Sequence, residues 1–272
     1  MNPRLLLDYY KIEPKKALGQ NFLHDPNALE KIVTSADMQK TDTVLEIGPG
    51  TAALTEVLAQ HAARVVAVEL DTRLEQLLRD RLGVYPNASV VFQDILETDV
   101  PALLGTTDYL VVANVPYYIT SAILRHLLEG AIRPRRLVLT VQLEVAERLV
   151  AKPGDLSLLS VSAQYYARAR IVMKLNPAVF YPRPDVTSAV VRLDVYDQPP
   201  VSVPDDELFF TVVRAGFSQK RKQIKNAIGD GLHLSSDAAV ALLEEAGIDP
   251  RRRAETLTLE EWAGLARAWA AR

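Results

Sequence analysis

The sequence predicts an α/β domain with a mostly parallel sheet and an antiparallel edge, followed by a small all-helical domain. Short valine-rich runs alternate with helix-like segments between residues 43 and 142, which is typical of a parallel sheet covered on both faces. Two strand-like segments, 169–175 and 187–195, then follow each other and indicate the antiparallel edge. Beyond the proline-rich stretch 197–204 only helical patterns remain, so we expect domains at residues 1–198 and 199–272.

Each element has its own sequence pattern. After a short helical start, Asp25 and Pro26 match a helix N-terminus, with a capping side chain before a proline in the first turn. That helix is expected to end near Met38. The next strands are valine-rich runs between polar or turn residues, expected at residues 43–48, 64–70, 89–93, 109–113 and 136–142. Helices are expected at residues 52–60, 72–82 and from about 121, and later at 207–216, 219–228, 236–245 and 259–270.

The composition is that of an ordinary globular protein and excludes several kinds of site. The chain has 272 residues, 49% of them hydrophobic, with a formal net charge of −3. It has no cysteine, which excludes disulfides and thiolate zinc sites, and its four histidines show no metal-ligand spacing. We therefore expect no metal. No apolar run approaches the ~20 residues that cross a membrane, and the start lacks a secretion signal, so a cytoplasmic protein is expected.

Basic residues gather in two places despite the acidic net charge. One group is Ser218–Asn226, with Arg214 one helical turn earlier, and the other is Arg251–Arg253. Such groups can bind a polyanion such as a nucleic acid. They can equally form the solvated face of a helix, and both interpretations stay open from the pattern alone.

A glycine turn follows the first strand of the sheet. In Gly48-Pro-Gly-Thr-Ala-Ala53 the two glycines permit a tight turn and a close approach of the backbone to a ligand, and the helix behind them directs its positive end to the same place. The alternative is a tight turn without a ligand, because this motif alone is a weak indicator.

Acidic residues follow the next two strands. Glu69 ends the second strand about 20 residues later, where a carboxylate can accept hydrogen bonds from both hydroxyls of a ribose. Both NAD and S-adenosylmethionine carry such a ribose. Asp94 follows the third strand and is placed to contact an adenine amine, although it could also be only a helix cap.

The stretch Asn114-Val-Pro-Tyr-Tyr118 comes directly after the fourth strand. The amine of adenine is a poor nucleophile because its lone pair is delocalised into the ring. If the Asn114 side-chain oxygen and the carbonyl of Val115 or Pro116 accept its two hydrogens, the nitrogen becomes nucleophilic and can be held in line with a methyl donor. Tyr117 offers a ring face for a base removed from its stack. The alternative is a strand-to-helix turn with both tyrosines packed in the core. For Tyr118 we expect a place in the core or at a hinge.

These motifs together resemble a known family, the ribosomal RNA adenine dimethyltransferases of the KsgA (RsmA) type, which are relatives of the macrolide-resistance Erm methyltransferases. The resemblance covers nearly the whole chain. It rests on the segments K-A-L-G-Q-N-F-L, V-L-E-I-G-P-G-T-A-A-L-T, V-A-V-E-L-D, Q-D-I-L, N-V-P-Y-Y-I-T-S, F-Y-P-R-P-D-V-T-S-A-V-V and F-S-Q-K-R-K-Q-I-K-N. The family commonly carries one more glycine where Ala53 stands.

The resemblance implies a Rossmann-like methyltransferase domain with S-adenosylmethionine as cofactor, and an N-terminal segment that closes over it. The implied substrate is small-subunit ribosomal RNA in a ribosomal subunit or its precursor, where two adjacent adenosines near the 3′ end each receive two methyl groups during subunit biogenesis. A monomer is expected. The implied cofactor-binding residues are Asn21, Leu23, Gly48, Glu69, Asp94 and Asn114. The implied catalytic residues are Asn114, Pro116, Tyr117 and Phe180, the last stacking on the second face of the target base.

Other functions are consistent with parts of the sequence. An Erm-type enzyme would act on large-subunit RNA, but the stretch 247–262 resembles the helical domain of KsgA proteins. A NAD-dependent oxidoreductase would leave Asn114–Tyr117 and Phe180–Pro184 without a role. A non-catalytic ribosome-assembly factor could use the same basic residues, because phosphate contacts give affinity without chemistry.

Overall fold

The computed structural model describes residues 2–219 and 221–272, and their contacts group them into two compact units. The first comprises the chain up to Ala146 together with Ala169–Val195, and the second comprises Glu147–Arg168 and Tyr196–Arg272. The second unit thus takes in residues 147–168, which sequence analysis assigned to the first domain. A folding boundary at residue 198 stays a prediction. No helix of the described residues is long and apolar enough to cross a membrane.

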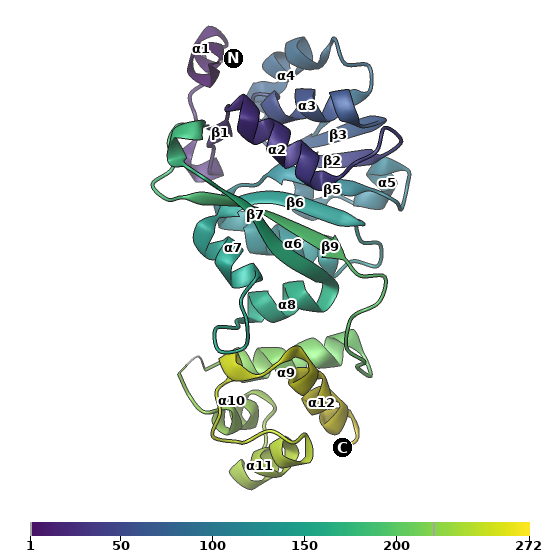
Figure 1. The fold of residues 1–272 in the computed structure, drawn as a ribbon, viewed down its shortest axis with the longest axis vertical. Helices are drawn as coiled ribbons and strands as arrows, with labels where there is room; N and C mark the ends of the chain where they lie inside the picture. Colours follow the sequence, from purple (N-terminus) through teal and green to yellow (C-terminus); the bar gives the residue numbers. More distant parts are fainter. Residues whose placement is uncertain (1, 220) are drawn as a thin grey trace. The chain divides into compact units, whose positions relative to one another are not determined.

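The first unit is built on a seven-stranded sheet in the order β4-β3-β2-β5-β6-β9-β7 (Figure 1). Pairing is parallel from β4 to β6 and antiparallel between β6 and β9, so the predicted mixed sheet is confirmed. Its strands are β2 (Thr43–Ile47), β3 (Arg64–Glu69), β4 (Ala88–Phe92), β5 (Leu110–Asn114), β6 (Arg136–Gln142), β7 (Ala167–Leu175) and β9 (Ser188–Val195).

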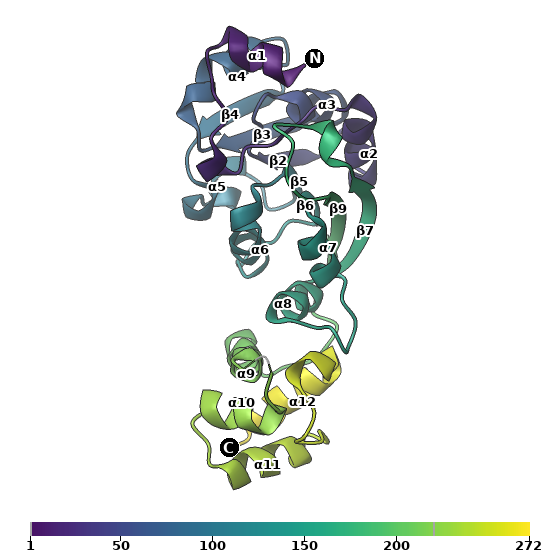
Figure 2. The same cartoon turned by 90° about the vertical axis from the view of Figure 1, so that its left-hand side faces the viewer.

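Helices cover both faces of this sheet. Figure 2 shows α2 and α3 on one face and α5 and α6 on the other, which explains why the parallel strands are continuous apolar runs. Asp25 caps α2, since its carboxylate accepts a hydrogen bond from the Ala28 amide at 2.8 Å, as predicted. The helices are α1 (Pro3–Tyr9), α2 (Pro26–Ala36), α3 (Ala53–His61), α4 (Glu75–Leu82), α5 (Val100–Leu104), α6 (Thr120–Leu128) and α7 (Leu143–Leu149).

A separate two-stranded ladder joins distant parts of the chain. Strand β1 (Phe22–Leu23) pairs antiparallel with β8 (Phe180–Tyr181), so the purple N-terminal segment of Figure 1 lies beside green chain far along the sequence. Phe22 stands opposite Tyr181, and Leu23 opposite Phe180. Because successive side chains of a strand face opposite ways, the two pairs contact different cores.

The second unit is helical, with α8 (Leu158–Tyr166), α9 (Asp206–Phe217), α10 (Ile224–Gly231), α11 (Ser236–Glu245) and α12 (Leu259–Ala270). The predicted helix at 219–228 is wrong at its start, because α9 ends at Phe217 and α10 begins at Ile224. The fully buried Trp262 packs against Phe217, with ring centroids 5.4 Å apart. This indole is the centre of the unit.

Two glycines of this unit lead to opposite stability predictions. A Cβ at Gly216 would lie 2.3 Å from the Trp262 ring, whereas one at Gly264 would meet nothing nearer than 3.6 Å. We expect Gly216→Ala to lower the unfolding free energy by about 1–3 kcal/mol through overpacking. Gly264→Ala should raise it by about 0.5–1 kcal/mol, because alanine loses less entropy in a helix. Urea unfolding measures both, and a neutral Gly216→Ala would contradict this packing.

Candidate functional site

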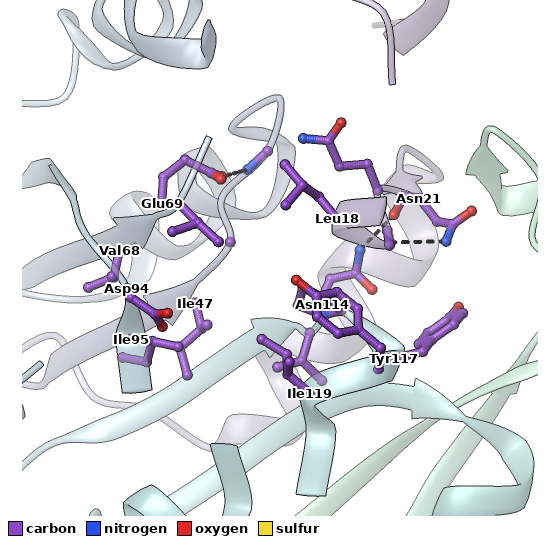
Figure 3. A pocket seen from close by; sticks show the side chains of 18 of the residues that line it. Leu18, Asn21, Ile47, Val68, Glu69, Asp94, Ile95, Asn114, Tyr117 and Ile119 are labelled. Carbon is purple, nitrogen blue, oxygen red and sulfur yellow. Dashed lines mark hydrogen bonds between the residues drawn. The ribbon is translucent and has the colours of Figure 1, made fainter. Parts of the chain in front are cut away.

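The candidate site is a pocket at the carboxyl ends of β2, β3, β4 and β5. Parallel strands bring these ends to one edge of the sheet, which is where open α/β sheets bind ligands. The pocket has an empty space of about 750 Å³, open solvent at its mouth included, which lies in the usual range for small-molecule sites. It is lined by residues 18–22, 47, 48, 50, 68–70, 93–95 and 114–119 (Figure 3).

The turn after β2 needs glycine at two positions for different reasons. Gly48 and Gly50 have φ angles of 69° and 56°, in the left-handed region. A Cβ at Gly48 would find no protein atom nearer than 4.0 Å, so the space beside it belongs to the pocket. A Cβ at Gly50 would lie 2.7 Å from the Phe22 ring. Gly48 therefore admits a ligand, and Gly50 admits strand β1.

A third left-handed residue falls on Ala52, whose φ angle is 65°, and not on Ala53, which begins α3. The position in this turn that favours another glycine is therefore one residue earlier than the one sequence analysis named. Ala52 is fully buried and packs in the cluster that contains Phe22.

Glu69 is fixed at the end of β3 by two backbone amides. Its carboxylate accepts hydrogen bonds from the Gly50 amide at 3.2 Å and from the Asp71 amide at 2.8 Å. Burial raises the pKa of Glu69, and these hydrogen bonds oppose that rise. The carboxylate lines the pocket in an orientation that the protein sets in advance.

Asp94 has both of the roles that sequence analysis weighed. One carboxylate oxygen, Oδ1, accepts a hydrogen bond from the Leu96 amide at 2.8 Å and so caps a short helical turn. The side chain also lines the pocket, and Figure 3 shows it close to Ile47 and Ile95. Within the described part of the chain Oδ2 makes no hydrogen bond, so it is available to a donor at the end of this apolar slot.

Asn114 is held by the N-terminal segment. Its amide nitrogen donates a hydrogen bond to the Asn21 carbonyl at 2.9 Å, and the Asn21 side chain in turn donates to the Gly19 carbonyl at 3.2 Å (Figure 3). Because its nitrogen is engaged in this way, the Asn114 amide presents its oxygen to a ligand.

The two backbone carbonyls after Asn114 are not equivalent. The Pro116 carbonyl accepts hydrogen bonds from the Ile119 amide and from the Thr120 hydroxyl, both at 3.3 Å. The Val115 carbonyl accepts none from the residues that the structure describes. The sequence is compatible with either carbonyl, and this geometry favours Val115 as the second acceptor.

The neighbouring tyrosines differ in exposure. The Tyr117 hydroxyl lies 2.6 Å from that of Ser188 on β9, and burial raises the pKa of Tyr117. Tyr118 lines the pocket and is 58% exposed, so the expectation that it packs in the core is wrong. Its residue type gave no indication of this, because a tyrosine at a helix start suits a core and a binding surface equally well.

Of the predicted site residues, Leu23 and Phe180 do not line the pocket. They are 4% and 2% exposed and pack in one core cluster with α2 and α3. Their neighbours along the chain, Phe22 and Tyr181, face the other way, and Phe22 lines the pocket. The stacking of Phe180 on a target base stays a prediction. A contribution of Leu23 to cofactor binding stays a prediction and would have to come from its backbone.

The basic residues of the second unit fall into two kinds. Arg251, Arg252 and Arg253 pair with nearby carboxylates, those of Asp249, Glu261 and Glu255. This pairing favours the solvated charge run over a binding site. Arg221 and Lys222 are exposed between α9 and α10, while Lys220 lies outside the described residues. These two remain candidates for phosphate contacts.

Comparison with known proteins matches the chain over nearly its whole length. The model of the family described as ribosomal RNA adenine dimethylase matches residues 12–270. Ribosomal RNA small subunit methyltransferase A of Geobacillus sp. (strain WCH70) is 46% identical over 275 residues, which cover 97% of this chain and 94% of the relative. The protein of the same name from Dehalococcoides mccartyi (strain CBDB1) is 43% identical over 261 residues, covering 96% and 90%.

Two solved structures share the fold at appreciable identity. The 23S rRNA methyltransferase ErmE has a TM-score of 0.73 at 29% identity, covering 91% of this chain and 99% of its own. A dimethyladenosine transferase from Plasmodium falciparum has a TM-score of 0.75 at 25% identity, covering 90% and 95%. The predicted Rossmann-like fold is confirmed by both.

The strand before the glycine turn carries a buried acid whose pKa is raised. Glu46 on β2 is 1% exposed, and its Oε2 has no hydrogen-bond partner among the described residues. Burial, reinforced by the charge of Glu69, raises the pKa of Glu46 to about 8 from an ordinary value of 4.5. The folded protein therefore holds one more proton than the unfolded chain between these two pH values.

We expect Glu46→Gln to remove this pH dependence. The unfolding free energy of the parent protein should fall relative to the variant by about 1.4 kcal/mol per pH unit as the pH rises from 5 to 8. Above about pH 8 the difference should be constant, because Glu46 is then ionised in both states. Urea unfolding of both proteins between pH 5 and 9 measures it, and parallel profiles would show that Glu46 ionises normally.

Proposed function

Because the chain belongs to the ribosomal RNA adenine dimethylase family, we propose that it dimethylates two adjacent adenosines near the 3′ end of small-subunit ribosomal RNA. The methyl donor is S-adenosylmethionine, which when bound supplies an electrophilic methyl group. The observation that carries the proposal is the orientation of Asn114, whose nitrogen is engaged by Asn21 so that its oxygen is left for a substrate amine.

The pocket residues fit this cofactor. Glu69 is a buried carboxylate already oriented by two amides, and it would accept hydrogen bonds from the ribose hydroxyls. Asp94 Oδ2 would accept from the adenine amine, with Ile47 and Ile95 beside the ring. The open space at Gly48 would receive the methionine part. Asn21 lies on the N-terminal side of the same pocket.

The target amine would be oriented by two acceptors at the end of β5. Asn114 Oδ1 and the Val115 carbonyl would each accept one of its N–H groups, which directs the nitrogen lone pair out of the ring plane toward the methyl donor. Held in this way, the nitrogen would be placed to accept the methyl group as its bond to the donor sulfur breaks, and the amine proton would leave to solvent. Pro116 contributes by fixing the backbone between these acceptors and Tyr117. Positioning of this kind replaces a strong base.

The tyrosines would contact the extruded base. The hydrogen bond to Ser188 holds the Tyr117 ring in one orientation, which supports a role as a stacking wall. The exposed ring of Tyr118 offers a further stacking surface at the mouth of the pocket. The exposed Arg221 and Lys222 would add phosphate contacts.

The identity to curated relatives favours the small subunit as substrate. The relatives at 43% and 46% identity are named small-subunit methyltransferases, whereas ErmE is 29% identical. A non-catalytic assembly factor would leave the oriented Asn114 amide without a role. We propose that the enzyme acts as a monomer on RNA within a ribosomal subunit or its precursor.

Methyl transfer to purified ribosomal subunits tests this function. Small and large subunits from a strain without the modification would be incubated with labelled S-adenosylmethionine, and the product nucleoside identified by mass. Dimethyladenosine in the small subunit is expected. Label only in the large subunit would assign the chain to Erm-type activity, and tight RNA binding without transfer would support the assembly factor.

Asn114→Ala should abolish most turnover without unfolding the protein. It removes the acceptor that orients the amine, so we expect kcat to fall by about 100-fold or more, as when one orienting group of an active site is lost. Asn27→Ala on the exposed surface of α2 is the control and should match the parent enzyme. Unimpaired turnover of Asn114→Ala would rule out this mechanism.

Phe180→Ala and Tyr118→Ala should have opposite consequences. Phe180 is a core side chain, so its truncation should cost about 3–5 kcal/mol of unfolding free energy. Tyr118→Ala should leave stability within about 0.5 kcal/mol but weaken RNA binding by about 1–3 kcal/mol, the usual value of one base stack. Denaturant unfolding and RNA titration separate the two. A stable Phe180→Ala variant that has lost methylation would restore Phe180 as a base contact.

A further inference from the structure

The segment that covers the pocket is attached to the rest of the molecule at defined points. We call residues 13–21 the strap. Its first residue accepts a hydrogen bond through the Glu13 carbonyl from Arg73 at 3.1 Å, and its last residue accepts one through the Asn21 carbonyl from Asn114 at 2.9 Å. Between these ends the Gln20 side chain forms the central attachment.

Gln20 uses both ends of its carboxamide. Its oxygen accepts a hydrogen bond from the Lys15 amide at 2.7 Å, which closes the strap into a loop. Its nitrogen donates to Asp71 Oδ2, also at 2.7 Å. One side chain thus determines both the shape of the strap and its distance from the end of β3.

Asp71 is well suited to hold the strap. It is 5% exposed and paired with Arg73, whose Nη2 lies 2.6 Å from Oδ2. Although burial acts against it, hydrogen bonds from Arg73 and Gln20 hold the pKa of Asp71 below its ordinary value, so the carboxylate is ionised at neutral pH. Its own backbone amide donates to Glu69 Oε1 at 2.8 Å. The strap is therefore attached to the residue that orients the pocket carboxylate.

We propose that Gln20 and Asp71 are positioning residues for methyl transfer, which couple the Glu69 end of the pocket to the Asn114 amide through residues 19–21 of the strap. The proposal rests on the function proposed above. Neither side chain needs to touch the target amine, since each acts through the Asn21 carbonyl.

The strap has little freedom to absorb a displacement of Gln20. Gly19 has a left-handed φ of 61°, and a Cβ there would lie 3.3 Å from the Tyr118 ring and 3.4 Å from Pro116. The backbone at Gly19 is thus packed against the turn that follows β5. A shift of Gln20 must move the adjacent Asn21 carbonyl, and about 1 Å would break its hydrogen bond with Asn114, since such bonds weaken beyond about 3.2 Å. The amide would then lose the orientation that presents its oxygen.

The test exchanges the amide of Gln20 and the carboxylate of Asp71 between the two positions, one substitution at a time. Gln20→Glu places two carboxylates at hydrogen-bond distance in a partly buried site and should open the strap. We expect kcat for methyl transfer to fall about tenfold, within the range that misplacement of about 1 Å produces. In the double variant Gln20→Glu/Asp71→Asn, the amide at position 71 can donate to the carboxylate at position 20, but it gives up the oxygen that pairs with Arg73 Nη2, so part of the lost kcat should return.

A matched control comes from α4, where Gln76 donates to Asp80 at 2.8 Å on an exposed surface. Gln76→Glu creates the same pair of carboxylates away from the pocket and should match the parent enzyme. Thermal unfolding of each variant shows whether it is folded. A Gln20→Glu enzyme with parental kcat would overturn the proposal, as would a folded double variant no faster than the single one.

The affinity for S-adenosylhomocysteine, measured by calorimetry, tests the role of the strap independently of methyl transfer. Residues 18–21 of the strap line the pocket, so Gln20→Glu should weaken this affinity and the double variant should restore part of it. If the parent protein transferred no methyl group, the proposed function would fail while the strap could still be tested in this way. Equal affinities for all variants would show that the Gln20–Asp71 hydrogen bond does not hold the strap in place at the pocket.

Discussion

The hydrogen bond from the Asn114 amide to the Asn21 carbonyl joins the end of β5 to a segment 93 residues earlier in the chain. Different parts of the fold position Asn114 and Asn21. Parallel pairing of β2, β3 and β5 carries Asn114 to the same edge as Gly48 and Glu69, and the β1–β8 ladder holds the chain that follows Asn21. This bond fixes which end of the Asn114 amide faces Asn21, so the side-chain oxygen is left as an acceptor for a ligand. Loss of either part would leave a turn that could bind donors and acceptors alike.

Local sequence patterns predicted the elements that depend on local physics. The strands β2 and β3 were recognisable because both faces of a parallel sheet are buried, which favours runs of apolar residues such as Val65–Val68. Asp25 and Pro26 gave the start of α2 because a cap and its proline act within one turn. The error at residues 219–223 has the same origin, since lysine, arginine and glutamine are good helix formers. The structure ends α9 at Phe217 and begins α10 at Ile224.

The site was predictable to the extent that strand ends determine it. Gly48, Glu69, Asp94 and Asn114 follow four parallel strands and meet at one edge, which topology alone requires. The direction of a side chain was not predictable where the element is too short to show a period. In the dipeptides Phe22-Leu23 and Phe180-Tyr181, a change of one residue exchanges core and pocket faces. Tertiary pairing, and no local preference, decides which aromatic ring is buried.

Two buried carboxyl groups near the pocket, Glu46 and Glu69, differ in the hydrogen bonds that they receive. Glu46 has an orphaned oxygen and a pKa of about 8, so it is neutral at pH 7 and adds no charge beneath the turn. Glu69 is nearly as buried but receives hydrogen bonds from Gly50 and Asp71. Backbone amides stabilise a carboxylate and oppose protonation. Were both groups ionised, the two negative charges would repel each other, which is one cause of the raised pKa of Glu46. With Glu46 protonated, the Gly50 and Asp71 amides orient Glu69, and its carboxylate would present its acceptors to a ribose.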